Sequence, residues 1–227
     1  MTRQHVSVRP PLQRRSKASL ERVLDAGTTL LEEKGYEGLT VAEVSRRAGV
    51  SVGAIYARVG SKDNLIRAIH ERVMARITEQ HGVFADVGRW EHLPTRELIE
   101  ETVREVAKII RANGALLGVF MHRGAVDEVI ARRGSASAAD LATKVESLLL
   151  TRRSEIRHPD PELAVDVCFR MSFATVSRRL MYGPTFESRR PIEWDPLVAE
   201  LGAACTAYLL DGSGAYGTLR TPCARGG

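Results

Sequence analysis

The sequence predicts an all-α protein with two helical domains, and three observations lead to that prediction. Apolar residues recur at spacings of three and four along most of the chain, which is the period of an amphipathic helix. Several of these stretches are bounded by residues that cap helices, such as Thr40 before one and Gly35 after another. The 227 residues, 44% of them hydrophobic, suffice for a substantial core in one or two domains.

Composition excludes several classes of protein. The longest apolar stretch, residues 115–121, is far shorter than the roughly 20 residues of a membrane-spanning helix, so we expect no membrane partner. The three cysteines are far apart and form no CxxC motif, which favours the reducing cytoplasm over a disulfide framework or a zinc site. The histidines form neither an HExxH motif nor an i, i+4 pair. We therefore expect no metal and no cofactor.

Positive charge is concentrated at the N-terminus. The first 75 residues hold 13 Lys and Arg against 8 Asp and Glu, within a net charge of +5 for the whole chain. Residues 1–17 contain five basic residues and no acidic one: Arg3, Arg9, Arg14, Arg15 and Lys17. This basic, disordered arm has three interpretations: a solvated terminus, an Arg-rich transit peptide or a segment that contacts DNA phosphates. Pro10 and Pro11 disfavour the long targeting helix of a transit peptide.

A helix-turn-helix is predicted within residues 18–73. A first helix over about 17–34 ends at Gly35. Thr40 and Glu43 then form a capping box, in which the hydroxyl accepts from the Glu43 amide and the carboxylate reaches back to the Thr40 amide. The short helix that follows stops at Gly49, and a second short helix begins after Ser51.

A further helix is predicted after the helix-turn-helix. Ser61 supplies its cap, and Asp63 lies in its first turn. The apolar residues that follow at helical spacing are Leu65, Ile66, Ile69, Val73 and Ile77. The N-terminal domain is thus predicted to be a three-helix helix-turn-helix domain, and this further helix follows it.

The second short helix has the side chains of a DNA-reading helix. Small residues allow close approach to a major groove about 12 Å wide and contact with thymine methyls. Arg58 is able to bond bidentately to guanine. The DNA-binding residues predicted here are Thr40, Ser51, Val52, Gly53, Ala54, Tyr56, Ala57, Arg58 and Lys62. Two alternatives stay open: the short helices pack under the C-terminal domain, or Tyr56 is a core residue.

The stretch AGTTLLEEKGYEGLTVAEVSRRAGVSVGAIYARVGSKDNLIRAI resembles the N-terminal domain of the TetR/AcrR regulators, over residues 19–75. Its Gly-Tyr, Thr-Val, Ala-Gly-Val, Tyr and Ser-Lys elements occur in order and at family spacing. The chain departs from the pattern at Ser45, Val59 and Gly60. The resemblance implies a homodimeric repressor that binds a double-stranded DNA operator and is released by a small-molecule effector. It places Thr40, Tyr56 and Lys62 at phosphates and Val52, Gly53, Ala57 and Arg58 near bases.

A hydrolase motif overlaps the same segment. Residues 49–53 match the GxSxG pattern of a nucleophile elbow, which requires a strand before the serine and a longer helix after it. Here a capped amphipathic helix precedes Ser51. We therefore interpret Ser51 as a helix cap and expect no enzyme.

The C-terminal domain, residues 74–211, is predicted to hold helices at about 95–111, 114–125, 136–153, 161–182 and 196–210. Asp160-Pro161 and Asp195-Pro196 each place an acceptor at the cap and a proline at the first helical position. The 161–182 helix is apolar on two faces, and the last helix carries small residues beside apolar ones. Together they predict a four-helix dimer interface, with burial inside one subunit as the alternative.

An effector pocket is implied by the resemblance alone. The residues offered for it are Trp90, Phe120, Met121, His122, Phe169, Arg170 and Phe173, each of which could equally be plain core. We expect a largely apolar effector. A Gly-rich disordered tail is expected over 212–227. The alternative function is a helical small-molecule carrier or enzyme that retains a vestigial DNA-binding head.

Overall fold

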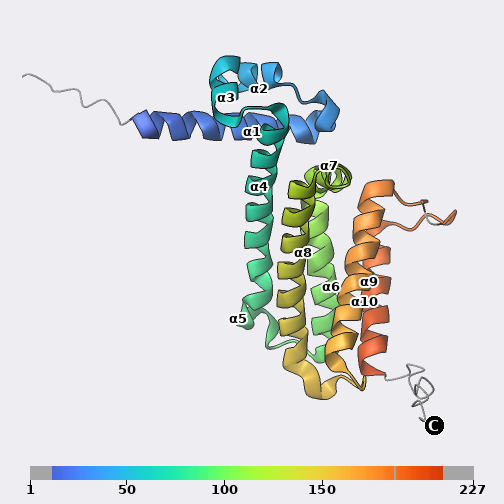
Figure 1. The fold of residues 1–227 in the computed structure, drawn as a ribbon. Helices are drawn as coiled ribbons and strands as arrows, with labels where there is room; N and C mark the ends of the chain where they lie inside the picture. Colours follow the sequence, from blue (N-terminus) through green and yellow to red (C-terminus); the bar gives the residue numbers. More distant parts are fainter. Residues whose placement is uncertain (1–11, 187, 212–227) are drawn as a thin grey trace, which may run out of the picture. The chain divides into compact units, whose positions relative to one another are not determined.

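The computed structural model describes residues 12–186 and 188–211 (Figure 1), and within them it contains helices and no strand. The predicted all-α class is therefore confirmed. The expected tail and residues 1–11 of the expected arm lie outside the described residues. The α-helices are α1 (Leu12–Gly38), α2 (Val41–Ala48), α3 (Val52–Val59), α4 (Lys62–Gln80), α5 (Val87–Trp90), α6 (Thr95–Ala112), α7 (Gly114–Gly124), α8 (Glu128–Leu149), α9 (Pro161–Tyr182) and α10 (Trp194–Leu210), with 3-10 helices at His81–Ala85 and Leu150–Glu155.

The chain forms two compact units. Unit 1 consists of the described residues up to 75 together with 115–134, and unit 2 consists of 76–114 with the described residues from 135. Residues 115–134 therefore group with the N-terminal helices, although they are distant from them in sequence. A sequence prediction that divides the chain into consecutive domains cannot anticipate that a later segment packs with the first unit.

The core of unit 1 lies where α1, α2, α3 and the first turns of α4 meet. Leu30, Leu39 and Leu65 are fully buried there. Gly27 lets α1 approach α4 closely, because a Cβ at this position would lie 2.5 Å from Cδ1 of Ile69. This packing holds the helix-turn-helix on a rigid base.

Helix α1 is longer than predicted at its start. It begins at Leu12 rather than about Lys17, so the last residues of the expected arm are helical. The segment follows two prolines and consists largely of residues with good helix propensity, which explains the extension. The sequence predicts that this helix ends at Gly35; this residue has the non-helical φ of 65°, but the helix is assigned as far as Gly38.

Three ion pairs join α4 to α7, α8 and the turn between them within unit 1. Asp63 pairs with Arg123 at 3.2 Å, and Glu71 pairs with Arg133 at 2.9 Å. Between them, Arg67 pairs at 2.9 Å with Asp127. The Asp127 carboxylate also accepts from two backbone amides in the first turn of α8, at 3.1 and 3.4 Å, and so caps that helix.

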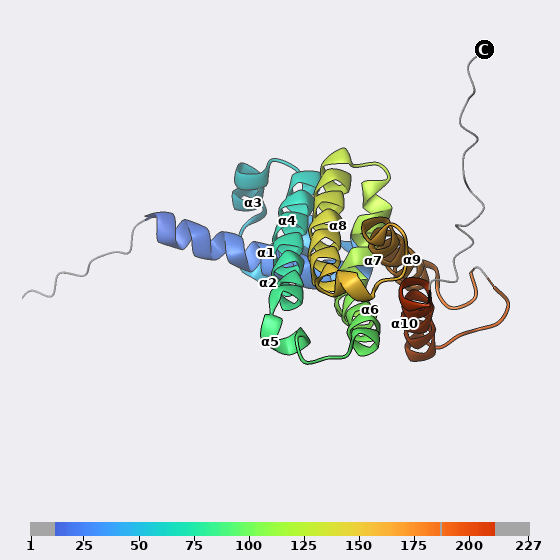
Figure 2. The same ribbon diagram turned by 90° about the horizontal axis from the view of Figure 1, so that it is seen from below.

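Unit 2 is built on α6, which packs against both α9 and α10; the three helices lie side by side in both views (Figures 1 and 2). A Cβ at Gly202 would lie 3.3 Å from the Cα of Glu100, so this glycine brings α10 close to α6. Cys205 and Leu209 are also buried inside the subunit. The sequence predicts that the last helix contributes its small and apolar residues to a dimer interface, but these three are buried within the subunit and do not contribute to one.

Among α8, α9 and α10, the start of α9 agrees with the prediction and the other two differ from it. Asp160 caps α9 by accepting from the Leu163 amide at 3.0 Å, as predicted. Helix α10 begins at Trp194 after Glu193, so Asp195 lies inside the first turn rather than at the cap. Helix α8 begins at Glu128 instead of about 136, because the Asp127 cap and the contacts with α4 stabilise a stretch whose Gly and Ser content argued against helix.

No helix in the ranges 12–186 and 188–211 is long and apolar enough to cross a membrane. Over the same residues, no cluster of three or more His, Cys, Asp or Glu side chains has an arrangement that could hold a metal ion.

Candidate nucleic-acid interface

The start of α2 is held by Thr40, as predicted, but only half of the capping box is present. The Thr40 hydroxyl accepts from the Glu43 amide at 3.2 Å. The Glu43 carboxylate instead accepts from Arg46, at 2.7 and 2.9 Å, and from Arg47, at 3.1 Å. These hydrogen bonds, those from Arg46 first, lower the pKa of Glu43 to about 2. The two arginines compete successfully for the carboxylate because they follow it at i+3 and i+4.

The turn between α2 and α3 depends on one glycine and one serine. Gly49 has φ 62° and ψ 37°, a left-handed conformation that ends α2. Ser51 then caps α3, its hydroxyl accepting from the Ala54 amide at 3.2 Å. The interpretation of Ser51 as a helix cap is confirmed, and α2 precedes it where the nucleophile elbow would need a strand.

Helix α3 is almost entirely exposed. Every one of its residues is described, and among them Ile55, at 1% exposure, is the only buried one. Val52 is 39% exposed and Tyr56 45% exposed, which rules out the alternative of a core tyrosine. Gly53, Ala54 and Ala57 are exposed as well. A helix whose small and apolar side chains are exposed to solvent offers a surface that another molecule can contact.

Arg58 is folded back onto α1. Its guanidinium donates to the carbonyl oxygen of Ser16 and, at 2.5 Å, to the Ser16 hydroxyl. The Arg58 side chain is exposed. The predicted contact with a base would require the Arg58 guanidinium to leave Ser16.

Lys62 is engaged at the start of α4. Its ammonium donates to the carbonyl oxygen of Tyr36 at 3.1 Å and lies 4.6 Å from the centroid of the Tyr36 ring. Arg123 lies over the same ring at 4.4 Å, and the Tyr36 hydroxyl donates to Asp63 at 2.8 Å. That hydrogen bond raises the pKa of Tyr36. Lys62 is half-buried. The cluster of Tyr36, Asp63 and Arg123 therefore orients the Lys62 side chain, which is predicted to contact a DNA phosphate.

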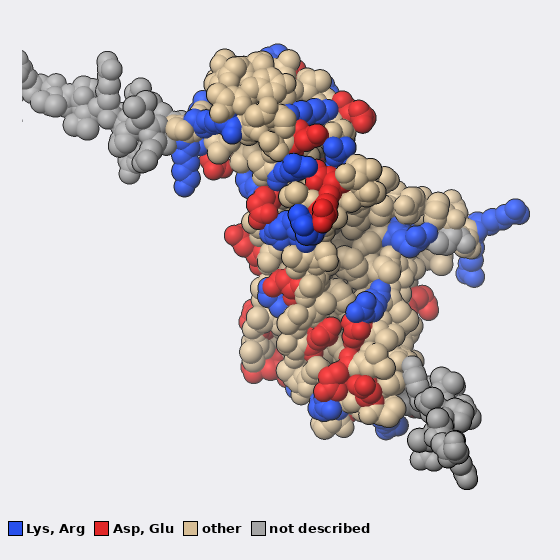
Figure 3. Space-filling view, viewed as in Figure 1, with Lys and Arg blue, Asp and Glu red and all other residues tan. Residues whose placement is uncertain are grey.

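The residues around Lys62 are a part of the site that the sequence prediction missed. In the sequence, Tyr36 belongs to the Gly-Tyr family element, and Arg123 lies far along the chain on α7. No spacing rule connects them, because their contact depends on the return of residues 115–134 to unit 1. In Figure 3, the surface over α2 and α3 is mainly uncharged, with Lys and Arg and some Asp and Glu at its margins.

The residues predicted for an effector pocket are divided between the two units. Phe120, Met121 and His122 lie on α7 in unit 1, where Phe120 is buried with its ring 4.6 Å from that of His70. The remaining four belong to unit 2: Trp90, Phe169, Arg170 and Phe173.

In unit 2, the four residues do not share one environment. Trp90 is 2% exposed and donates its indole N–H to the Val83 carbonyl at 2.7 Å. Phe169 stacks on Phe173 with ring centroids 5.5 Å apart. Arg170 is exposed and pairs with Asp166 at 2.8 Å. The set of seven therefore stays a prediction about an effector rather than a single described cavity.

Comparison with known proteins gives two family matches. Residues 23–69 match the family described as bacterial regulatory proteins, tetR family. Residues 94–209 match the family described as tetracyclin repressor-like, C-terminal domain. The two matches lie in the N-terminal and C-terminal parts of the chain, and the second covers about half of it.

Individual relatives agree with these matches. The HTH-type transcriptional repressor BdcR of Escherichia coli is 30% identical over 105 residues, which is 46% of this chain and 51% of that protein. The HTH-type transcriptional repressor AcnR of Corynebacterium glutamicum is 26% identical over 123 residues, which is 49% of this chain and 62% of that protein. The chain thus spans between half and two thirds of the length of these relatives.

Solved structures with the same fold cover nearly the whole chain. A TetR-family transcriptional regulator from Mesorhizobium loti has a TM-score of 0.65 at 18% identity, covering 86% of this chain and 96% of that one. A TetR transcription regulator from Haloarcula marismortui has a TM-score of 0.63 at 13% identity, covering 85% and 97%. At sequence identities below 20%, these structures show that the fold is shared and nothing more.

Proposed function

The chain belongs to the TetR family of bacterial regulatory proteins, and from that membership we propose that it is a ligand-responsive transcriptional repressor. It binds a palindromic DNA operator as a homodimer, and a small-molecule effector releases it. The relatives that match are regulators, which disfavours the alternative of a carrier or enzyme with a vestigial head. Such a repressor works in the cytoplasm beside the chromosome, in agreement with the cysteine content.

The observation that carries this proposal is the exposure of α3. Ile55 anchors the helix, while Val52, Ala57 and their neighbours face solvent on a capped helix held by α1 and α2. Small side chains allow the helix to enter a major groove, and Arg58 supplies a fork of donors for guanine. The N-terminal amides of α2, α3 and α4 suit phosphate oxygens.

DNA binding is tested by selecting bound fragments of the source genome with the purified protein and measuring affinity for the selected site by fluorescence anisotropy. The variant Ala57→Glu places a negative charge on the exposed face of α3 and should abolish selection. The matched control is Ala139→Glu, an exposed alanine on α8, which should retain it. If both variants select the wild-type site equally well, α3 is not the DNA-reading helix.

The dimer proposal depends on the outer face of α9. Leu163 is 47% exposed and Met171 is 41% exposed, although both are large apolar residues, and the opposite face of the helix is buried through Cys168 and Val176. A second copy of the same face would cover them across a two-fold axis. The two-fold axis then requires an operator with matching half-sites.

Effector release is proposed to act through α7. Phe120 and His122 lie on this helix, and one residue further Arg123 contacts Asp63 at the start of α4 and the ring of Tyr36 on α1. An effector that displaces α7 would therefore disturb the cluster that positions Lys62. Coupling between two binding sites is reciprocal, so operator DNA must weaken effector binding by the factor by which the effector weakens DNA binding.

A thermal-shift screen of small apolar molecules supplies an effector for this test. Its affinity is then measured calorimetrically with and without operator DNA. Equal affinities in the two titrations would contradict effector release.

A further inference from the structure

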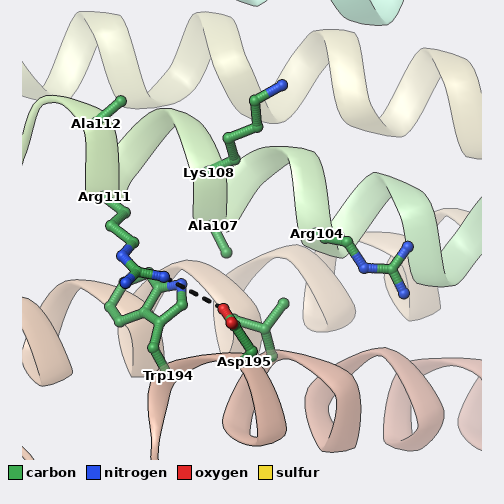
Figure 4. Close-up of a pocket in the computed structure, with 8 residues that line it drawn as sticks. Arg104, Ala107, Lys108, Arg111, Ala112, Trp194 and Asp195 are labelled. Carbon is green, nitrogen blue, oxygen red and sulfur yellow. Dashed lines mark hydrogen bonds and ion pairs between the residues drawn. The ribbon is translucent and has the colours of Figure 1, made fainter.

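A groove in unit 2 lies apart from all residues predicted to bind DNA or effector. It is formed between α6 and α10 and has a volume of about 520 Å³ (Figure 4). Its lining residues are Arg104, Ala107, Lys108, Arg111, Ala112, Trp194, Asp195 and Val198. Because one wall carries basic side chains and the other carries an indole ring, the groove combines charge and apolar surface.

The basic side chains of the groove are not equivalent. Arg104 pairs with Glu101 on its own helix, and Lys108 lies 3.3 Å from Glu105. Lys108 also points away from α10 in Figure 4. Arg111 is different, because its guanidinium reaches across the groove to α10.

Arg111 is held by two contacts on the far wall. It lies 5.5 Å from the centroid of the Trp194 ring and pairs with Asp195 at 3.2 Å. The two side chains of the ion pair are 59% and 87% exposed, so water screens their attraction and the pair contributes little. A ligand carboxylate can therefore replace Asp195 at modest cost, with the guanidinium already positioned.

The apolar part of the groove lies beside this guanidinium. Ala107 and Val198 are 1% and 5% exposed and form its base, while Trp194 offers a half-exposed ring. An aromatic ring placed here would bury its faces against indole and methyl groups. Further along both helices, Gly202 brings α10 close to α6.

We propose that this groove binds a small aromatic monocarboxylate. The carboxylate accepts two hydrogen bonds from Arg111 in place of Asp195, and the ring packs against Trp194 and the apolar base. The ligand thereby joins α6 to the start of α10. The proposal is independent of DNA binding, since the binding measurement uses the protein without DNA.

The chain contains two tryptophans, which allows a site-specific measurement. In a nitrogen-15 spectrum of the full chain each gives one indole N–H signal, and the Trp194→Phe variant assigns them. Phenylacetate is the probe, and the neutral phenylacetamide is its matched control. We expect phenylacetate to shift the Trp194 signal saturably, with a Kd on the order of 1 mM for about ten heavy atoms. The Trp90 signal should stay in place because that indole is buried and bonded to the Val83 carbonyl.

Two substitutions must act in opposite directions. Arg111→Gln should weaken phenylacetate binding about tenfold, because a charge-assisted bidentate contact is lost. Asp195→Asn should tighten it about threefold, because the competing carboxylate is removed. The control Arg132→Gln removes a comparable exposed arginine on α8 and should change nothing.

The comparison of acid and amide in the wild-type protein tests the proposal even if a variant fails to fold. Equal shifts with phenylacetate and phenylacetamide, joint movement of both indole signals, or no saturable shift would each overturn it. Operator binding measured on the same samples keeps this outcome separate from the fate of the repressor proposal.

Discussion

Replacing Asp127 tests whether α7 and α8 belong energetically to the N-terminal unit. The Asp127 side chain is 2% exposed, pairs with Arg67 at 2.9 Å and caps α8 through the amides of Val129 and Ile130. Loss of a helix cap costs about 1 kcal/mol. Loss of the partner of Arg67, which is 40% exposed, adds about 0.5–1 kcal/mol after allowance for solvent screening. Asp127→Ala should therefore lower the free energy of unfolding by about 2 kcal/mol.

The conservative variant separates the two contributions. Asp127→Asn keeps an oxygen that accepts from the α8 amides and loses the charge that faces Arg67, so it should cost about 0.5–1 kcal/mol. Glu128→Gln, at the next position, is the matched control. Its pair with Arg132 joins side chains that are 79% and 69% exposed, and its loss should cost less than about 0.5 kcal/mol.

Urea unfolding followed by circular dichroism measures these differences at one fixed protein concentration, because dimerisation would couple stability to concentration. A loss of 2 kcal/mol corresponds to about 4–8 °C in Tm for a chain of this size. The reasoning would be refuted if Asp127→Ala were as stable as Glu128→Gln. If Asp127→Asn cost as much as Asp127→Ala, the capping contribution would be wrong.

The pH dependence gives an independent check on the same carboxylate. Burial alone would raise the pKa of Asp127, but hydrogen bonds from Arg67 and from the Ile130 and Val129 amides hold it below its ordinary value of 3.8. A carboxyl group whose folded pKa is depressed contributes stability above its unfolded pKa and loses it as the pH falls through the folded pKa. The stability difference between wild type and Asp127→Asn should be constant near neutral pH and shrink below pH 3.8.

Three further predictions concern the proposed interface and dimer. Ile55→Ala should lower the free energy of unfolding by about 2–5 kcal/mol in urea titrations, since Ile55 is 1% exposed and anchors α3; a loss below 1 kcal/mol would contradict that role. Arg58→Ala should relax preference at one base position by about 1–3 kcal/mol, whereas Lys62→Ala should weaken all sequences alike and flatten the log-affinity against log-salt slope by about one unit per monomer. Anisotropy titrations against singly substituted operators over a salt series measure both, and exchanged phenotypes would mean that α3 docks in another orientation. Leu163→Glu with Met171→Glu should give a monomeric mass by light scattering where wild type is dimeric, and a monomeric wild type that keeps tight operator binding would contradict the dimer.

Local sequence patterns were sufficient to predict much of the helix-turn-helix in the N-terminal unit. Helix periods, the serine before α3, the glycine at φ 62° after α2 and the aspartate before α9 act over a few residues, so their effects can be worked out without knowing the fold. The bounds of α9 agree with the prediction at both ends. Where a local rule failed, a nearby competitor was responsible: Glu43 turned to Arg46 and Arg47 instead of completing the capping box.

Tertiary structure decided what local rules do not reach. Helix α8 extends toward its N-terminus because Arg67 and the Asp127 cap stabilise it across 60 positions of sequence. Gly202 packs on α6 inside the subunit. The sequence shows that α10 carries small residues, but only the folded chain determines which helix packs against them. Lys62 is directed by Tyr36 and Arg123, which come together because residues 115–134 return to the N-terminal unit. Caps and periodicity depend on short-range geometry and can be derived from the sequence, whereas these contacts depend on the path of the whole chain and exist only once it has folded.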